Sequence, residues 1–231
     1  MNATPDYTVL DNPGCSALTG PHAPLAIGGD RAKRYPSDMS PFAAIGDYDD
    51  PEAWAELAVL AGPGNGIGLA GRSEDLPAGW ESVFSGTGLQ MIGESVEGEP
   101  DDDAIDLTDA DVPEMLELIG LTQPGPFEQR TIDFGGYLGI REDGRLVAMA
   151  GQRLNPEGWI EISAVCTHPE YQHRGLAGRL SLAVAFDIRE AGNIPFLHVR
   201  ATNTNAIRVY ERLGFTVRRE TLFEQLRSPS H

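Results

Sequence analysis

The segment Gln172-His173-Arg174-Gly175-Leu176-Ala177 places polar side chains and a glycine just before a predicted helix. At such a position several backbone N–H groups have no partner within the helix, and the helix dipole presents its positive end. Both features favour a bound pyrophosphate, and Gly175 permits a close approach of the backbone. Gly178 extends the turn, while Arg174 and Arg179 can pair with phosphate oxygens. The segment is therefore a candidate anion-binding turn.

Three further side chains give this turn a specific context. Glu161 stands eleven positions before Gln172, in the segment Trp159 to Thr167. Asn203 and Tyr210 lie downstream, within NTNAIRVYERLGF. Because the glycine turn alone is a frequent pattern, the specificity of the site comes from these residues.

The elements around the turn follow from their hydrophobic patterns. Alternation in WIEISAVCT predicts a strand over Trp159 to Thr167. Apolar residues at helical spacing predict a helix over Leu176 to Ala191, which Gly192 ends. Phe196 to Val199 follows as a strand, and Asn205 to Leu213 as a helix. The turn is thus expected between a strand and a helix.

The segments before the turn predict a strand, a helix and a hairpin. Ile105 to Leu107 is the strand, and Thr108 with Asp111 forms a capping arrangement for the helix that follows. Tyr137 to Ile140 and Leu146 to Ala150 flank an EDG turn, which predicts the hairpin.

The end of the chain completes the expected fold. Phe215 to Val217 and Thr221 to Leu226 predict a last hairpin. The order β-α-ββ-β-α-β-α-ββ over residues 101–231 indicates a mixed α/β fold with a largely antiparallel sheet flanked by helices.

The stretch from Glu161 to Phe215 resembles the GNAT superfamily of N-acetyltransferases. The family's paired signatures match EISAVCTHPEYQHRGLA and N-x-x-A-x-x-x-Y-x-x-x-G-F. The resemblance extends from Ile105 to Leu226, and it is strong over Trp159 to Phe215. It implies a GNAT-type sheet and an acyltransferase that uses acetyl-CoA as cosubstrate and no metal.

The resemblance also assigns roles to single residues. The strand carrying Val165 to Thr167 splays from its neighbour in the family and offers backbone groups to the pantetheine arm. The residue that matches Asn203 contacts this arm in the family. The residue that matches Tyr210 protonates the departing thiolate. The residue that matches Glu161 is a carboxylate, which deprotonates the amine in some members. The expected cofactor-binding residues are Val165, Cys166, Thr167, Gln172, His173, Arg174, Gly175, Leu176, Ala177, Gly178, Asn203 and Tyr210.

The expected reaction is direct transfer of an acetyl group to an amine in a ternary complex. An alkylammonium ion has no lone pair, so transfer needs a base, a group that accepts charge at the carbonyl, and an acid at sulfur. Glu161, strand N–H groups and Tyr210 can fill these roles in that order. His168 and His198 compete for the role of base, and Cys166 as an acyl-carrying nucleophile is a further alternative. A non-catalytic acyl-CoA-binding sensor or scaffold is the alternative function.

Charge and composition restrict the partners. The net charge is -18, and residues 73–129 hold 15 acidic and no basic residues, which argues against nucleic-acid binding. No secretory signal or membrane-length apolar stretch is evident, so a cytoplasmic protein without membrane contact is expected. Cys15 and Cys166 lack metal-ligand spacing. The expected partners are acetyl-CoA and an amine-bearing small molecule or peptide N-terminus, with the protein a monomer or homodimer.

Residues 1–100 are expected to form a separate α/β unit of unknown role, with 101–231 as the acetyltransferase domain. The acidic run at residues 94–103 is interpreted as an exposed connector between them. Pro51 to Leu60 predicts a helix, and Ile67 to Ala70 and Val83 to Ile92 predict strands. GPGNGIGLAG lacks the ending of a phosphate loop and is interpreted as a turn. One hypothesis is that this unit is a degenerate half of a second GNAT-like fold.

Overall fold

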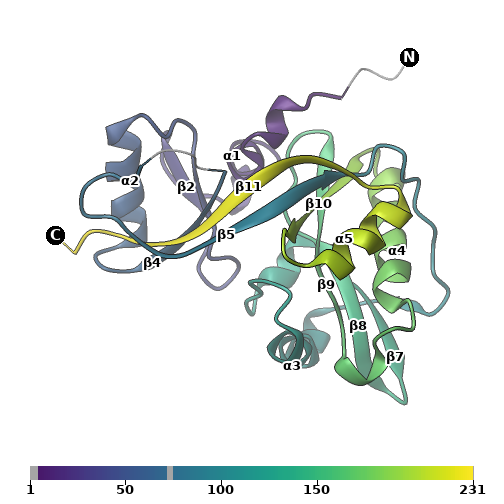
Figure 1. Cartoon of the computed structure of the whole chain (residues 1–231). Coiled ribbons are helices and arrows are strands. Elements are labelled where there is room, and N and C mark those ends of the chain that lie inside the picture. The colour runs from purple at the N-terminus through teal and green to yellow at the C-terminus, as the bar shows by residue number, and fades with distance from the viewer. Residues whose placement is uncertain (1–4, 72–74, 231) are drawn as a thin grey trace.

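The computed structural model describes residues 5–71 and 75–230 (Figure 1). Its strands are β1 (Ile27–Gly28), β2 (Ala32–Arg34), β3 (Ala43–Ile45), β4 (Gly66–Ala70), β5 (Glu81–Ile92), β6 (Ala104–Asp106), β7 (Leu138–Glu142), β8 (Arg145–Gln152), β9 (Trp159–Thr167), β10 (Ile194–Arg200) and β11 (Thr216–Arg227). Its α-helices are α1 (Pro13–Thr19), α2 (Pro51–Ala61), α3 (Val112–Thr122), α4 (Leu176–Glu190) and α5 (Thr204–Leu213).

An eight-stranded sheet in the order β4-β11-β5-β10-β9-β8-β7-β6 forms the centre of the molecule. Its neighbouring strands run antiparallel except for β9 and β10, which run parallel. A smaller antiparallel sheet, β1-β2-β3, packs with α1 and α2 in the first part of the chain. The predicted α/β fold with a largely antiparallel sheet flanked by helices is confirmed.

Strand β5 comes from the first hundred residues, yet it lies between β10 and β11 in the central sheet. Figure 1 shows β5 and β11 as two long strands that run side by side from the region of α2 to the region of α4 and α5. The expected boundary near residue 100 therefore does not coincide with a boundary of the sheet. Residues 5–71 and 75–100 thus contribute β4 and β5 to the central sheet and β1, β2 and β3 to the smaller one.

The prediction of a terminal hairpin over Phe215 to Leu226 is wrong. The segment is a single strand, β11, which pairs with β5 along its whole length and has a register shift between Val217 and Arg219. The residues 218–220 (RRE) offer none of the glycine or asparagine that a tight hairpin turn favours. With twelve residues of β5 available as a partner, the strand continues through a bulge.

The two faces of the sheet are covered by different parts of the chain. On β10, Leu197 and Val199 belong to the core cluster that contains the apolar stripe of α4. Phe196 and His198 alternate with these two residues and therefore point to the opposite face, where Phe196 packs with Trp159 and Tyr35. The N-terminal segments thus cover the face opposite to α4.

The acidic run at residues 94–103 is docked on α4, although most of its carboxylates are exposed. Val96 is buried, and the backbone N–H of Glu99 donates to the carbonyl of Leu182. Arg189 donates to the carbonyls of Gly93 and Val96. The expected connector is therefore a strap fixed along the helix.

Two smaller expectations are confirmed. The glycine-rich segment after α2 is a turn, in which Gly62 and Gly64 have positive φ, followed by β4. Thr108 and Asp111 form a reciprocal capping box before α3. No helix in the described parts of the chain is long and apolar enough to cross a membrane.

Candidate active site

The parting of β9 from β10 creates the candidate site. The two strands pair in parallel only from Trp159 to Ile162 on β9. Beyond that point β10 continues along β5, whereas β9 continues along β8. The edge of β9 that faces β10 is therefore open over residues 163–167.

A bulge in β9 lies just past the parting. Met149 pairs with Cys166 and Gly151 pairs with Ser163, so two residues of β9 oppose one of β8. One of the two, Ala164, has φ of 53°. Bulges bend a strand and redirect its backbone groups, and this one turns the end of β9 away from β10.

The predicted anion-binding turn connects β9 to α4. His173 and Gly175 both have positive φ, and Gly175 is the N-cap residue of α4. The first backbone hydrogen bond of the helix runs from the N–H of Arg179 to the carbonyl of Gly175. The preceding N–H groups have no intrahelical acceptor and are available to an anion.

Helix α5 contributes two of the predicted residues. Asn203 caps the helix, since its side chain accepts a hydrogen bond from the N–H of Ala206. Tyr210 packs edge-on against Phe215 and is only 9 % exposed. Its hydroxyl has no hydrogen-bond partner among residues 5–71 and 75–230. Burial raises the pKa of Tyr210 to about 12, so the phenol stays protonated at neutral pH.

These elements enclose one cleft of about 1410 Å³. That volume exceeds the roughly 300–1,000 Å³ of an ordinary small-molecule pocket. The predicted residues that line it come from β9, the turn, the start of α4, and α5 with its N-cap; they are Val165, Cys166, Thr167, Gln172, His173, Gly175, Leu176, Ala177, Gly178, Asn203 and Tyr210.

Arg174 is the predicted cofactor residue that does not line the cleft. Its guanidinium forms an ion pair with Glu142 and lies over the ring of Tyr171. Arg179 does line the cleft, but it pairs with Asp101 and Asp103 of the acidic strap, at 2.6 Å each. The hydrogen bond from Arg179 lowers the pKa of Asp101.

Glu161 is completely buried and does not line the cleft itself. Its carboxylate accepts hydrogen bonds from Arg153 Nε at 2.9 Å and Nη2 at 2.7 Å, and Nδ1 of His198 lies 2.7 Å from Oε1. Burial alone would raise the pKa of Glu161, but the charge of Arg153 and the bond to His198 outweigh it, so the pKa lies well below its usual value. The carboxylate is ionised at neutral pH.

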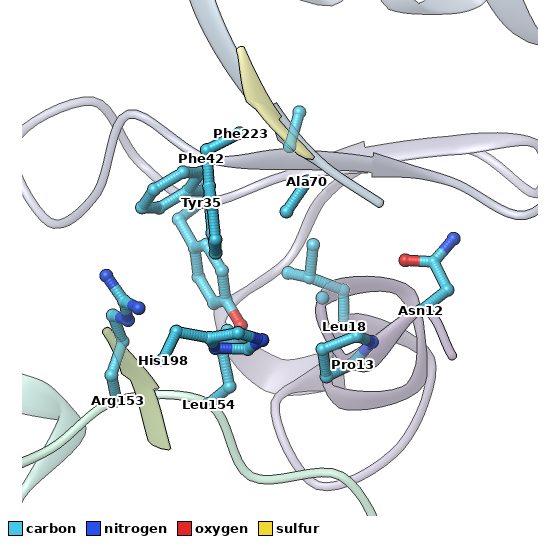
Figure 2. Close-up of a pocket in the computed structure, with 12 residues that line it drawn as sticks. Asn12, Pro13, Leu18, Tyr35, Phe42, Ala70, Arg153, Leu154, His198 and Phe223 are labelled. Carbon is cyan, nitrogen blue, oxygen red and sulfur yellow. The ribbon is translucent and has the colours of Figure 1, made fainter. Parts of the chain in front are cut away.

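Arg153 and His198 connect Glu161 to the cleft, which they both line. Figure 2 shows them beside a smaller cavity of about 20 Å³, together with Tyr35 and the rings of Phe42 and Phe223, which meet edge to face. The guanidinium of Arg153 lies 5.2 Å from the ring centre of Phe42. The N-terminal segments therefore reach the floor of the cleft.

The alternatives for the catalytic groups differ in their surroundings. His168 does not line the cleft; its Nδ1 accepts from the N–H of Glu170, and its Nε2 lies 2.7 Å from Nη2 of Arg145. Burial raises the pKa of the Cys166 thiol to about 11, which disfavours a thiolate nucleophile. His198 lines the cleft, with Nε2 3.2 Å from the side-chain nitrogen of Gln90.

Several lining segments were not predicted from the sequence. They are Phe42, residues 84–88 of β5, the loop at 123–126, Arg153, and residues 223–225 of β11. Gly86 and Gly88 in β5, and Pro124 to Pro126 after α3, were the available signals, since glycine and proline mark irregular or closely approached backbone.

A sheet with one splayed parallel pair, and a glycine turn leading from it into a helix, defines the acetyltransferase class of folds that the sequence resembles. Residues 137–224 match the family described as FR47-like protein. A solved structure described as an acetyltransferase of the GNAT family, from Novosphingobium aromaticivorans, is 38 % identical over 94 % of this chain and 97 % of that one, with a TM-score of 0.87. This chain belongs to the GNAT family.

Two curated proteins share shorter segments with it. A mycothiol acetyltransferase of Acidimicrobium ferrooxidans is 35 % identical over 94 residues, which cover 38 % of this chain and 30 % of that protein. The N-alpha-acetyltransferase RimI of Mycobacterium tuberculosis is 37 % identical over 82 residues, covering 34 % of this chain and 51 % of that protein. The matches thus span about half or less of these relatives.

Proposed function

We propose that this protein transfers an acetyl group from acetyl-CoA directly to an amine acceptor while both are bound. One observation carries the proposal: β9 leaves β10 after Ile162, and the cleft that opens there also contains the start of α4 and Tyr210. A donor bound along β9 and an acceptor entering from the other side would meet at this parting.

The residues of the cleft fit acetyl-CoA. The Oγ1 of Thr167 on β9 is buried without a hydrogen-bond partner, and no atom outside the adjacent residues lies within 4 Å of the position that a Cβ of Gly175 would take. The backbone of Val165 to Thr167 would hold the pantetheine arm. The N–H groups of residues 175–178, with Gln172 and His173, would hold the pyrophosphate. When bound, acetyl-CoA supplies the acyl thioester.

Tyr210 is proposed as the acid. Its hydroxyl is protonated at neutral pH and is not engaged elsewhere in the described chain. It can therefore deliver a proton to a sulfur anion that forms in the cleft.

Glu161 is proposed as the base that receives the proton of the amine. A base must be ionised, and the pairing with Arg153 secures the ionised form. The same pairing makes the carboxylate a weak base. Because Glu161 does not line the cleft, the proton would have to reach it by way of a group such as His198.

A panel of amines, assayed by release of the CoA thiol, tests the reaction and the acceptor class together. The Tyr210→Phe variant should lose about 10²–10⁴-fold in turnover with nearly unchanged binding of acetyl-CoA. Tyr48→Phe is the matched control, since the Tyr48 hydroxyl donates to the carbonyl of Ala70 and does not line the cleft. Thiol release at the wild-type rate by Tyr210→Phe would remove Tyr210 from the mechanism. Acetyl-CoA binding without thiol release on any amine would favour a sensor or scaffold.

A further inference from the structure

Strand β5 has an unpaired edge that borders the cleft. It pairs with β11 along Glu81 to Ile92, but with β10 only from Gly88 to Ile92. Past Gly88 the chain of β10 turns into α5, and the last contact is a hydrogen bond from the N–H of Ala201 to the carbonyl of Thr87. On that side, residues 81–86 have no neighbouring strand among the described residues.

The direction of the free backbone groups follows from this last contact. Since the carbonyl of Thr87 points toward the β10 side, the residue two positions earlier, Ser85, points its N–H and carbonyl the same way. The pairing with β11 agrees, because Leu222, opposite Thr87, directs its carbonyl away from β5 to the N–H of Gly71. The N–H and carbonyl of Ser85 therefore face the open side.

This edge belongs to the cleft that Tyr210, the proposed acid, also lines. Phe84, Ser85 and Thr87 line the cleft, which is also lined by residues of β9 and by Tyr210. Val83 and Phe84 expose 54 % and 56 % of their surface. Proteins usually protect a free, apolar strand edge with proline or lysine, because such an edge attracts extended chains. Residues 81–87 (ESVFSGT) contain neither.

We propose that the acceptor is the N-terminal segment of an extended peptide, which adds to the free edge of β5 as a short strand. This inference rests on the proposed acetyl transfer and specifies its substrate. Unpaired N–H and C=O groups recognise another peptide backbone, whereas a compact amine offers no alternating partners. The exposed side chains of Val83 and Phe84 point to opposite faces of the sheet, so each would pack against the peptide side chains on its own face.

The substrate side of the test compares three acceptors with the same first residue. These are a tetrapeptide with a free α-amine, the amide of its first amino acid, and a set of the same tetrapeptide N-methylated at one internal backbone nitrogen each. The tetrapeptide should exceed the amide about tenfold or more in kcat/KM, and methylation at one position should lower its kcat/KM about five- to tenfold, as expected for the loss of about one backbone hydrogen bond.

The enzyme side compares Ser85→Pro with Ser85→Ala. Proline removes the N–H that faces the cleft and spares the ladder to β11, while alanine keeps the N–H and removes only the hydroxyl. Ser85→Pro should raise KM for the tetrapeptide about five- to tenfold and leave the KM of acetyl-CoA and the turnover of a small amine unchanged. Ser85→Ala should behave as wild type. Thermal unfolding of both variants checks that the strand is intact.

The outcomes separate this inference from the proposed function. Absence of thiol release with every amine would refute the acetyl transfer itself. Acetylation of small amines with no gain for the tetrapeptide, or equal kinetics for Ser85→Pro and Ser85→Ala, would refute the peptide edge and leave the acetyl transfer standing. If Ser85→Pro unfolds, the kcat/KM values of the N-methylated peptides alone test whether the acceptor pairs with the edge of β5.

Discussion

Arg153 clamps the carboxylate of Glu161 with two hydrogen bonds, at 2.9 and 2.7 Å, where both side chains are almost entirely buried. The clamp joins β9 to the segment that leaves β8, directly beneath the cleft. It stabilises the charge of a carboxylate that has no access to water. The proposed base is therefore also a structural residue, and its two roles need separate measurements.

The stability of the pair can be tested with Glu161→Gln. The change leaves the guanidinium of Arg153 buried without its counter-ion, and removing one partner of a buried pair costs about 3–5 kcal/mol. Chemical denaturation at pH 7 should show a loss of this size. The double variant Glu161→Leu with Arg153→Met should recover part of it, since two apolar residues leave no uncompensated charge. A single variant as stable as the wild type would contradict the clamp.

The catalytic role of Glu161 is tested by the pH dependence of the same Glu161→Gln variant. At neutral pH its turnover should fall about 10²-fold or more if a proton acceptor has been removed. The loss should shrink toward pH 10, where the acceptor amine is increasingly deprotonated without help. A purely structural defect would give the same fractional loss at every pH at which the variant is folded.

The anion-binding turn can be tested with two glycines at opposite ends of α4. Gly175 and Gly192 both have φ of 79°, and no neighbouring atom lies within 4 Å of the Cβ position of either. Glutamate at either site meets the same backbone strain. Gly175→Glu adds a negative charge at the proposed pyrophosphate site and should abolish acetyl-CoA binding in calorimetry, whereas Gly192→Glu should bind normally. Equal loss in both variants would attribute the effect to strain.

The burial of His22 predicts that the folded protein loses stability in mild acid. Its Nδ1 lies 2.9 Å from the hydroxyl of Tyr35, and burial lowers the pKa of His22 from 6.5 to about 4. The unfolded chain therefore takes up a proton at a higher pH than the folded one. The contribution of His22 to the free energy of unfolding should be constant above pH 6.5. Between pH 6.5 and 4 this contribution should fall by on the order of 3 kcal/mol.

The variant His22→Gln removes the titrating group while keeping a polar side chain near Tyr35. Its free energy of unfolding should be lower at pH 7 but less dependent on pH between 6.5 and 4. Urea unfolding at half-unit pH steps measures both curves. Parallel curves for wild type and variant would show that His22 does not titrate differently in the folded protein.

The acidic strap is predicted to weaken cofactor binding. Asp101 and Asp103 lie near the first turn of α4 and hold Arg179, which also lines the cleft. Replacing both with asparagine frees Arg179 and removes negative charge near the proposed pyrophosphate site. Affinity for acetyl-CoA should rise about two- to fivefold at low ionic strength and approach the wild-type value in 1 M salt, where such charges are screened. The substitution pair Asp47→Asn with Asp49→Asn, remote from α4 in the sequence, is the control.

The sequence by itself determined the local elements of the donor half. Spacings of two to four residues encode the alternation of residues 159–167, the apolar stripe and glycine stop of α4, and the capped start of α5. In the structure β9 has the predicted range, and the ends of α4 and α5 lie within one residue of the predicted ends. Eleven of the twelve predicted cofactor residues line one cleft for the same reason. Each of them lies close in the chain to a turn or helix end that fixes its direction.

The tertiary structure decided what depends on partners far apart in the chain. The sequence of Thr216–Arg227 does not indicate that this segment will pair with β5, which lies more than a hundred residues earlier. A hairpin was therefore predicted where a single strand forms. The ionisation of Glu161 depends on Arg153 and His198, two residues that lie outside β9. The same long-range pairing leaves an edge of β5 free beside the cleft. Pairing energies between distant strands depend on the whole sheet, and no short sequence window contains them.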